Sequence, residues 1–243
     1  VAEAAAHAAK SWTRDGRTDA TDLRLVTLDP AGSMDLDQAF MLEQTTAGMR
    51  LHYAIADVAA FVTAGGPIDN ESHRRGETLY LPNGRVPLHP LVLSENAASL
   101  LPGQDRPAVL WRIDLDRDGE PLEVDVRRAV VRSTSQLDYD SLQRAGGEVF
   151  GLLEQFGRLR QQREHDRGAV SLPEPEQQVD GDGSSWTLSY RAPLPVEDWN
   201  AQMSLLTGMS AARLMLDGGI GLLRTMPPPD PHSVESLRRS ALA

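Results

Sequence analysis

Strand patterns dominate the first 133 residues, and the longest helical patterns come after them. Runs rich in apolar and β-branched residues predict strands at 23–28, 39–45, 49–58, 108–115, 122–133, 186–190 and 220–224. Unbroken helical patterns predict helices at 2–12, 68–75, 142–167 and 196–217. Because strands come first and long helices follow, the chain is predicted to be α+β, an irregular mixed α/β fold. We expect a mostly antiparallel or mixed sheet with long helices packed on it.

The segment 76–107 interrupts these regular patterns. It contains five prolines, each of which fixes the backbone angle φ and removes a backbone donor. We therefore predict an irregular segment that drapes over the domain. Polar, glycine-containing stretches predict a connection at 14–22 and tight turns at 117–120 and 180–183.

The composition excludes several classes of site. The chain of 243 residues has no cysteine, so it can hold neither a disulfide nor a zinc site built on thiolates. The six histidines are scattered, with no pair at ligand spacing on one helix. No basic-then-apolar signal segment opens the chain, and no apolar run is long enough to span a bilayer. We therefore expect a cytoplasmic protein that does not contact membranes.

The formal net charge of −11 argues weakly against nucleic-acid binding, because the phosphate backbone attracts Lys and Arg. Aspartates gathered at a metal site also make the net charge negative. Net charge alone therefore leaves the partner undecided.

Three aspartates lie close together where a predicted strand runs into a Pro/Gly loop and back into a strand. They are Asp29, Asp35 and Asp37. Asp35 and Asp37 are two residues apart, so they face the same side of an extended backbone. Carboxylates in a small volume repel one another and need a cation to stay ionised. Oxygen-only ligands suit Mg²⁺ or Mn²⁺, so we predict such a metal site here.

Three other interpretations of the aspartates were considered. The spacing excludes the first and leaves the other two open. An EF-hand loop fails, because Ala31 and Ser33 stand where oxygen ligands belong. An Asp-x-Asp metal site of the kind that nucleotide-sugar enzymes use is also compatible with Asp35 and Asp37. Turn and cap residues on a solvated loop are a third interpretation, and spacing alone does not decide against them. Asp57 is predicted to cap a turn rather than to bind metal.

The aspartate segment and its neighbours form an ordered series of motifs. The series is Leu28-Asp29-Pro30, Asp35-Leu36-Asp37-Gln38-Ala39, His52-Tyr53-Ala54-Ile55-Ala56-Asp57-Val58, Phe61-Val62, Arg75-Gly76-Glu77-Thr78-Leu79-Tyr80-Leu81-Pro82, Val86-Pro87-Leu88-His89-Pro90, Leu93-Ser94, Ser99-Leu100-Leu101 and Arg106. It resembles the catalytic RNB domain of the ribonuclease II / ribonuclease R family, strongly over 23–139 and more weakly to 224. The resemblance implies an N-terminal helix and connection at 1–22. An RNB-like catalytic domain at 23–243 would follow, incomplete at its C-terminal end.

The resemblance implies a 3′→5′ exoribonuclease that hydrolyses single-stranded RNA to nucleoside 5′-monophosphates. It implies Mg²⁺, or alternatively Mn²⁺, and no small-molecule cofactor. Asp29, Asp35 and Asp37 match metal-site aspartates of the family, and Asp37 matches the one on which catalysis depends most. Gln38 matches a further catalytic position.

Four residues are implied to contact RNA: Tyr80, Arg106, Leu172 and Gln202. Tyr80 matches an aromatic that stacks on a base near the 3′ end, which is a sequence-tolerant contact. Leu172 stands where the family often has a second stacking aromatic, and Gln202 replaces a glutamate.

The chain also departs from the family at Gln38, where the family usually has a fourth aspartate. An uncharged amide predicts weaker binding of a second metal ion. The family's Ser-Pro-Ile-Arg-Arg-Tyr segment and its OB-fold domains are not found in this sequence. The alternative is therefore an RNB-like RNA-binding or scaffold protein with impaired catalysis. The oligomeric state and the RNA preference stay open.

Overall fold

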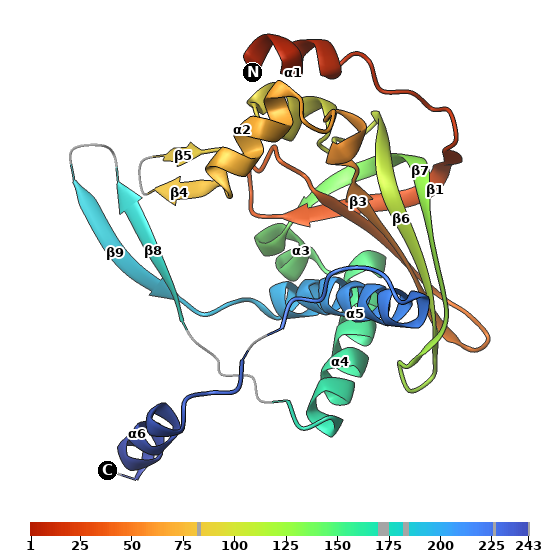
Figure 1. The fold of residues 1–243 in the computed structure, drawn as a ribbon. Coiled ribbons are helices and arrows are strands. Elements are labelled where there is room, and N and C mark those ends of the chain that lie inside the picture. The colour runs from red at the N-terminus through yellow and green to blue at the C-terminus, as the bar shows by residue number, and fades with distance from the viewer. Residues whose placement is uncertain (82–83, 170–174, 182–184, 226, 243) are drawn as a thin grey trace. The chain divides into compact units, whose positions relative to one another are not determined.

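The computed structural model describes residues 1–81, 84–169, 175–181, 185–225 and 227–242 (Figure 1). The chain forms two compact units, Val1–Thr207 and Gly208–Ala243. A search of the described helices for a membrane span finds none with the necessary length and apolar character.

The first unit is built around a closed barrel of five of the described strands (Figure 1). In barrel order these are β1 (Thr18–Asp29), β2 (Gln38–Gln44), β3 (Gly48–Ala56), β6 (Asp105–Asp116) and β7 (Pro121–Asp138). Neighbours pair antiparallel except β1 and β7, which are parallel and close the barrel. The mixed sheet is thus confirmed. Its closure, which leaves no free sheet edge, was not predicted.

Small and large apolar side chains alternate inside the barrel. Alanines from different strands, including Ala39 and Ala54, are fully buried beside Leu25, Leu36 and other residues of one core cluster. A narrow barrel interior needs this mixture of small and large side chains. Burial does not alternate strictly along every strand, because residues 25–28 of β1 and 129–131 of β7 are all buried.

Short elements cover one end of the first unit. They are α1 (Ala2–Ala8), η1 (Val58–Ala60), α2 (Pro67–Arg75), the hairpin of β4 (Leu79–Leu81) and β5 (Gly84–Val86), and the π-helix η2 (Leu93–Ala97). Apolar residues of α1, α2 and η2 form a second core cluster, which includes Ala5, Ile68 and Leu93. The segment predicted to be irregular therefore contains a hairpin and a π-helix.

Helices dominate the chain after β7. They are α3 (Tyr139–Ala145), α4 (Glu148–Asp166), α5 (Pro195–Gly218) and α6 (Pro231–Ala241), with the hairpin β8 (Glu176–Gly181) and β9 (Trp186–Arg191) between α4 and α5. The predicted helix at 142–167 is in fact two helices. Gly146 and Gly147 separate them with positive φ angles of 65° and 99°, which glycine adopts without strain.

Two other predictions are wrong, and a third is confirmed only in part, because Asp57 is the N-cap residue of η1. β1 begins at Thr18, inside the segment 14–22 that was expected to be a connection. No strand forms at 220–224, where Leu222 is 91% exposed and no neighbouring strand among the described residues pairs with it. Asp57 does not cap a turn with its side chain. Its carboxylate instead pairs with Arg17 at 2.7 Å, and both side chains are buried. The turn expected at 180–183 lies largely outside the described residues.

Candidate active site

Ser99 fixes the loop that joins β1 to β2. Its hydroxyl donates to the carbonyl of Met34 at 2.6 Å and accepts from the amide of Leu36 at 3.0 Å. Leu36 is fully buried in the barrel core. The carboxylates on either side of it, Asp35 and Asp37, line surface cavities instead. The anchored loop therefore directs one apolar side chain inward and two acidic side chains outward.

Two cavities meet at this loop. The first, here called the aspartate cavity, has a volume of about 460 Å³ and is lined by Asp29, Asp35, Asp37, Gln38, Tyr53, Tyr139, Asn200, Ser204 and nearby apolar residues. The second, here called the Tyr80 cavity, has a volume of about 390 Å³ and is lined by Asp35, Asp37, Gln38, Thr78, Tyr80, Arg85, His89, Ser94 and nearby apolar residues. The two cavities share Asp35, Asp37 and Gln38, so these side chains lie where the cavities join.

Like charges and burial raise the pKa values of two of the aspartates. Burial, followed by the charges of Asp37 and Asp35, raises the pKa of Asp29 to about 6. Desolvation and the charge of Asp35 also raise the pKa of Asp37, whose side chain remains open to the cavities. The Oδ2 atom of Asp29 is buried without a hydrogen-bond partner in the described part of the chain. A cation at this position would supply the missing partner and offset the repulsion.

Asp35 has a cationic partner of its own. Arg85 of β5 donates to Asp35 Oδ2 at 2.7 Å and also pairs with Glu95 of η2. Within the described ranges, no three His, Asp or Glu side chains form a ready-made set of metal ligands. A metal ion bound through Oδ2 of Asp35 would therefore compete with Arg85.

Two tyrosines form hydrogen bonds in the aspartate cavity. The Tyr53 hydroxyl donates to Gln38 Oε1, and Asn200 Nδ2 donates to the Tyr139 hydroxyl at 3.2 Å. Burial raises the pKa of Tyr53 and of Tyr139, so both hydroxyls keep their protons.

Comparison with known proteins identifies the domain. The family model of the RNB domain matches residues 17–242. The chain belongs to the RNB family. Inactive exonuclease DIS3L2 of Arabidopsis thaliana and Exoribonuclease 2 of Serratia proteamaculans are both 38% identical to this RNB chain, over 130 and 129 residues.

Both matches cover 52% of the RNB chain, but 12% of the Arabidopsis protein and 20% of the Serratia protein. RNase R of Mycoplasma genitalium, solved in complex with double-stranded RNA, superimposes with a TM-score of 0.90 at 25% identity. That match covers 99% of this chain and 46% of RNase R. The resemblance to the RNB family and the α+β fold are thereby confirmed.

The RNB fold brings five of the predicted site residues to the two cavities. They are Asp29, Asp35, Asp37, Gln38 and Tyr80. Tyr80 is 73% exposed on β4, so it is not a core residue. The catalytic, metal-binding and base-stacking roles of the five residues remain predictions.

Two further predicted residues lie elsewhere, and a third is not among the described residues. Arg106 lines neither cavity, and its guanidinium donates to the carbonyls of Ser99 and Asp105. Gln202 is buried, with its amide donating to Glu164 of α4 at 2.7 Å. Leu172 lies outside the described residues. The structure therefore does not bring Arg106 or Gln202 to the site, and their contacts with RNA remain predictions.

Several cavity residues are not among the site residues predicted from the sequence. They are Tyr53, Arg85, Tyr139, Asn200 and Ser204. Asn200 and Ser204 are one helical turn apart on α5, and two polar residues at this spacing on a largely apolar helix are a usable signal. Tyr53, Arg85 and Tyr139 have no comparable local signal, because tertiary packing brings them to the site.

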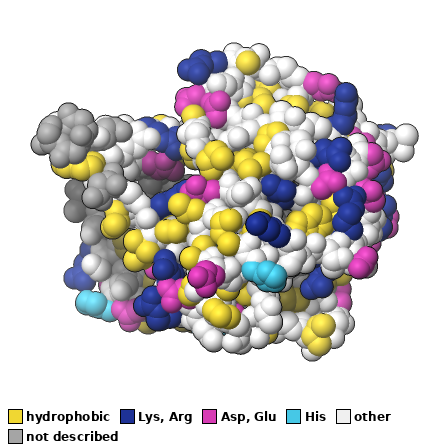
Figure 2. Space-filling view, turned by 90° about the horizontal axis from the view of Figure 1, so that it is seen from above, with side chains coloured by type: hydrophobic (Ala, Val, Ile, Leu, Met, Phe, Trp, Pro, Cys, Tyr) yellow, Lys and Arg dark blue, Asp and Glu magenta, His cyan; other side chains and the backbone are white. Residues whose placement is uncertain are grey.

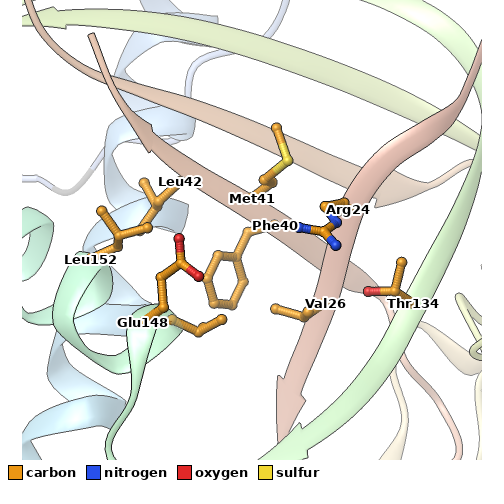
Figure 3. Close-up of a pocket in the computed structure, with 9 residues that line it drawn as sticks. Arg24, Val26, Phe40, Met41, Leu42, Thr134, Glu148 and Leu152 are labelled. Carbon is orange, nitrogen blue, oxygen red and sulfur yellow. The ribbon is translucent and has the colours of Figure 1, made fainter.

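A third cavity, of about 410 Å³, lies beside β1, β2 and α4 (Figure 3). Its walls are largely apolar, with Arg24, Thr134 and Glu148 as polar exceptions. Phe40 lines this cavity and the aspartate cavity. Glu148 is its sole acidic lining residue, so the third cavity lacks the carboxylate cluster of the candidate site.

Charges of both signs are interspersed on the face drawn in Figure 2. Lys and Arg side chains lie there among Asp and Glu side chains and apolar groups, without one extended basic patch. On that face, the surface resembles a mixed-charge protein surface more than a broad nucleic-acid footprint.

Proposed function

We propose that this protein hydrolyses single-stranded RNA from its 3′ end, with a divalent cation, and releases nucleoside 5′-monophosphates. The observation that carries the proposal is the convergence of Asp29, Asp35, Asp37 and Gln38 in the aspartate cavity, the last three of them where it meets the Tyr80 cavity. One cavity also presents the exposed ring of Tyr80. A carboxylate cluster beside an exposed aromatic suits phosphodiester chemistry on an unstacked strand.

The residues of the aspartate cavity fit a hard divalent cation. Their donors are carboxylate oxygens, which Mg²⁺ and Mn²⁺ prefer. The buried Oδ2 of Asp29 lacks a partner within the described residues, and its pKa is raised by burial and two neighbouring charges. We infer that Asp29, Asp35 and Asp37 hold the cation. When bound, such a cation polarises the scissile phosphate and lowers the pKa of the attacking water.

The protein groups around the aspartates position the RNA strand. Tyr80 would stack on a base near the 3′ end, with its ring face open to the Tyr80 cavity. Asp37 belongs to both cavities, so it would lie beside the phosphodiester that links the last two nucleotides. Arg85 donates to the carboxylate of Asp35, and a cation bound through the same oxygen would compete with it.

Relatives support RNA as the substrate. Exoribonuclease 2 of Serratia proteamaculans carries the activity in its name, and RNase R of Mycoplasma genitalium has been solved with double-stranded RNA. The chain spans less than half of each of these proteins. The preference for single strands and the 3′→5′ direction are thus part of the proposal.

A second candidate is an RNA-binding protein that has lost hydrolysis. Gln38 favours it, because an amide replaces the charged group that the family usually has beside Asp37. The Arabidopsis relative named Inactive exonuclease DIS3L2 is as similar to this chain as the Serratia enzyme.

Incubation of the protein with single-stranded RNA that carries a 5′ label distinguishes the two candidates. A 3′→5′ exonuclease with Mg²⁺ should shorten the labelled strand stepwise and release unlabelled nucleoside 5′-monophosphates, and EDTA should stop it. Binding of the strand without shortening would favour the RNA-binding candidate. Neither binding nor shortening would contradict both.

A further inference from the structure

Gln38 and Tyr53 form a hydrogen bond that the chemistry proposed above does not use. Gln38 begins β2, and Tyr53 lies on the adjacent strand β3. The ring of Tyr53 is 2% exposed, and its hydroxyl donates to Gln38 Oε1. A buried neutral hydroxyl thus holds the carbonyl end of the Gln38 amide against the barrel wall.

In the structure, this contact places the oxygen end of the Gln38 amide against Tyr53. An amide side chain has one acceptor oxygen and one NH₂ group with two donors. Because Oε1 accepts from Tyr53, the amide has its Nε2 group at the other end. Gln38 is exposed and lines both cavities, and its Nε2 makes no hydrogen bond in the described part of the chain. The end of the Gln38 amide that is open to the cavities is therefore its NH₂ group, a hydrogen-bond donor.

A donor at this position suits an anion rather than a cation. Metal ions require an oxygen with free lone pairs, which an NH₂ group does not offer. A non-bridging phosphate oxygen accepts hydrogen bonds from neutral amides. Around Gln38, the carboxylates of Asp29, Asp35 and Asp37 repel phosphate, so an uncharged donor is also less repulsive than a fourth carboxylate.

We propose that Gln38 is a phosphate-binding donor rather than a metal ligand, and that Tyr53 is the positioning residue that orients it. Nε2 of Gln38 then donates to a non-bridging oxygen of the RNA phosphate beside Asp37. This inference rests on the proposed action on RNA. It replaces the expectation that the amide oxygen would bind a second metal ion weakly.

RNA affinity in EDTA tests the donor role without metal and without cleavage. Fluorescence anisotropy with a labelled single-stranded RNA should show that Gln38→Met weakens binding by about tenfold to 150-fold, the loss expected for one hydrogen bond to a charged group. Gln44→Met, at the far end of β2, is the matched control and should bind like the wild type. Equal affinity of Gln38→Met and wild type would overturn the proposal.

A double-mutant cycle tests the role of Tyr53. Tyr53→Phe removes one hydroxyl and keeps the buried ring, so the barrel should remain folded by circular dichroism. It should weaken RNA binding about threefold in the wild type and have no further effect in Gln38→Met. An equal loss in both backgrounds would mean that Tyr53 acts independently of Gln38, which contradicts the positioning role.

Two further measurements separate this inference from the proposed function. In NMR spectra, the side-chain NH₂ signals of Gln38, assigned by their absence in Gln38→Met, should shift in Tyr53→Phe whether or not RNA binds. Unchanged signals would contradict the orientation by Tyr53. If Gln38→Met instead lowers Mg²⁺ affinity and leaves RNA binding in EDTA unchanged, Gln38 is a metal ligand. Wild type that binds no RNA would contradict the proposed function and, with it, the donor role.

Discussion

Asp29 has the most unfavourable electrostatic environment of the three aspartates. One of its oxygens is buried without a partner among the described residues, and Asp37 and Asp35 add like charges. The folded protein therefore holds the Asp29 proton more tightly than the unfolded chain does, because the pKa is raised from its ordinary value to about 6. The stability contributed by this group is present below the ordinary pKa and is lost as the pH rises through about 6.

Asp29→Asn should consequently stabilise the metal-free protein at about pH 7 and have little effect at about pH 4. Asparagine has nearly the same shape and never ionises. Thermal unfolding in EDTA across this range measures the difference, and Mg²⁺ at about pH 7 should reduce it by stabilising the ionised wild type. A difference in melting temperature that is the same at both pH values would contradict the account.

Arg85 occupies the side of Asp35 that a cation would need. Arg85→Met should therefore bind Mg²⁺ more tightly, by at least about threefold, because one positive charge leaves the site and one carboxylate becomes free. Isothermal titration calorimetry measures this affinity. Arg158→Met is the control, since Arg158 pairs with Glu154 on the exposed face of α4. Unchanged or weaker binding by Arg85→Met would show that Arg85 and the cation do not compete.

The hairpin of β4 and β5 is the element that presents an aromatic ring and a cation to the site. Tyr80 pairs with Arg85 across the hairpin, and both line the Tyr80 cavity. Their neighbours Leu79 and Leu81 are exposed and are absent from the cavity lining. Successive side chains of a strand point to opposite faces, so Tyr80 and Arg85 line the cavity while their neighbours do not.

Tyr80→Ala should weaken RNA binding by about fivefold to 150-fold, which corresponds to the ~1–3 kcal/mol of one stacked base. The melting temperature should stay near that of the wild type, because the ring is exposed. Leu79→Ala, on the same strand, should leave RNA affinity unchanged. Loss of stability without loss of RNA affinity in Tyr80→Ala would mean that the ring serves packing.

Local elements could be predicted from the sequence, whereas long-range pairings could not. The aspartates converge as predicted because Asp29, Asp35 and Asp37 lie on one short segment. The break at Gly146 was missed because helical patterns continue on both sides of it. The parallel pairing of β1 with β7 joins segments more than 100 residues apart, as in Thr18 opposite Ala129. No local pattern specifies such a pair.

Contacts between distant segments also could not be predicted at the candidate site. Tyr53 has an ordinary strand sequence, and its contact with Gln38 arises from the register of β2 and β3. Arg106 was expected at the RNA because of its place in the motif series. Its hydrogen bond to the carbonyl of Ser99 connects β6 to the segment that anchors the aspartate loop, and its contact with RNA stays a prediction. The order of the motifs predicts candidate functional residues, whereas tertiary packing determines the hydrogen-bond partners of each one.

At the scale of the whole molecule, one buried ion pair ties the start of β1 to the end of β3. Arg17 and Asp57 are 8% and 6% exposed in their side chains. Asp57→Ala leaves a buried guanidinium unpaired and should cost about 3–5 kcal/mol of unfolding free energy. The melting temperature should fall by roughly 10 °C.

Glu154→Ala provides the matched control for that substitution. It breaks an exposed pair with Arg158, so it should change the unfolding free energy by less than about 1 kcal/mol. Chemical denaturation of both variants measures the two costs. Equal losses of unfolding free energy in Asp57→Ala and Glu154→Ala would contradict a special role for the buried Arg17–Asp57 pair.

The proposed function depends most directly on Asp37, which we expect to act in RNA hydrolysis at the junction of the two cavities. Asp37→Asn keeps the size of the side chain and removes a negative charge that faces phosphate, so RNA affinity should be equal or slightly higher. Hydrolysis should fall by about 100-fold or more, because the lost charge matters more in the transition state than in the ground state. Single-turnover cleavage and RNA binding by wild type and Asp37→Asn measure both effects. Cleavage by Asp37→Asn within about threefold of wild type, well below the tenfold change that ~1.4 kcal/mol represents, would contradict the account.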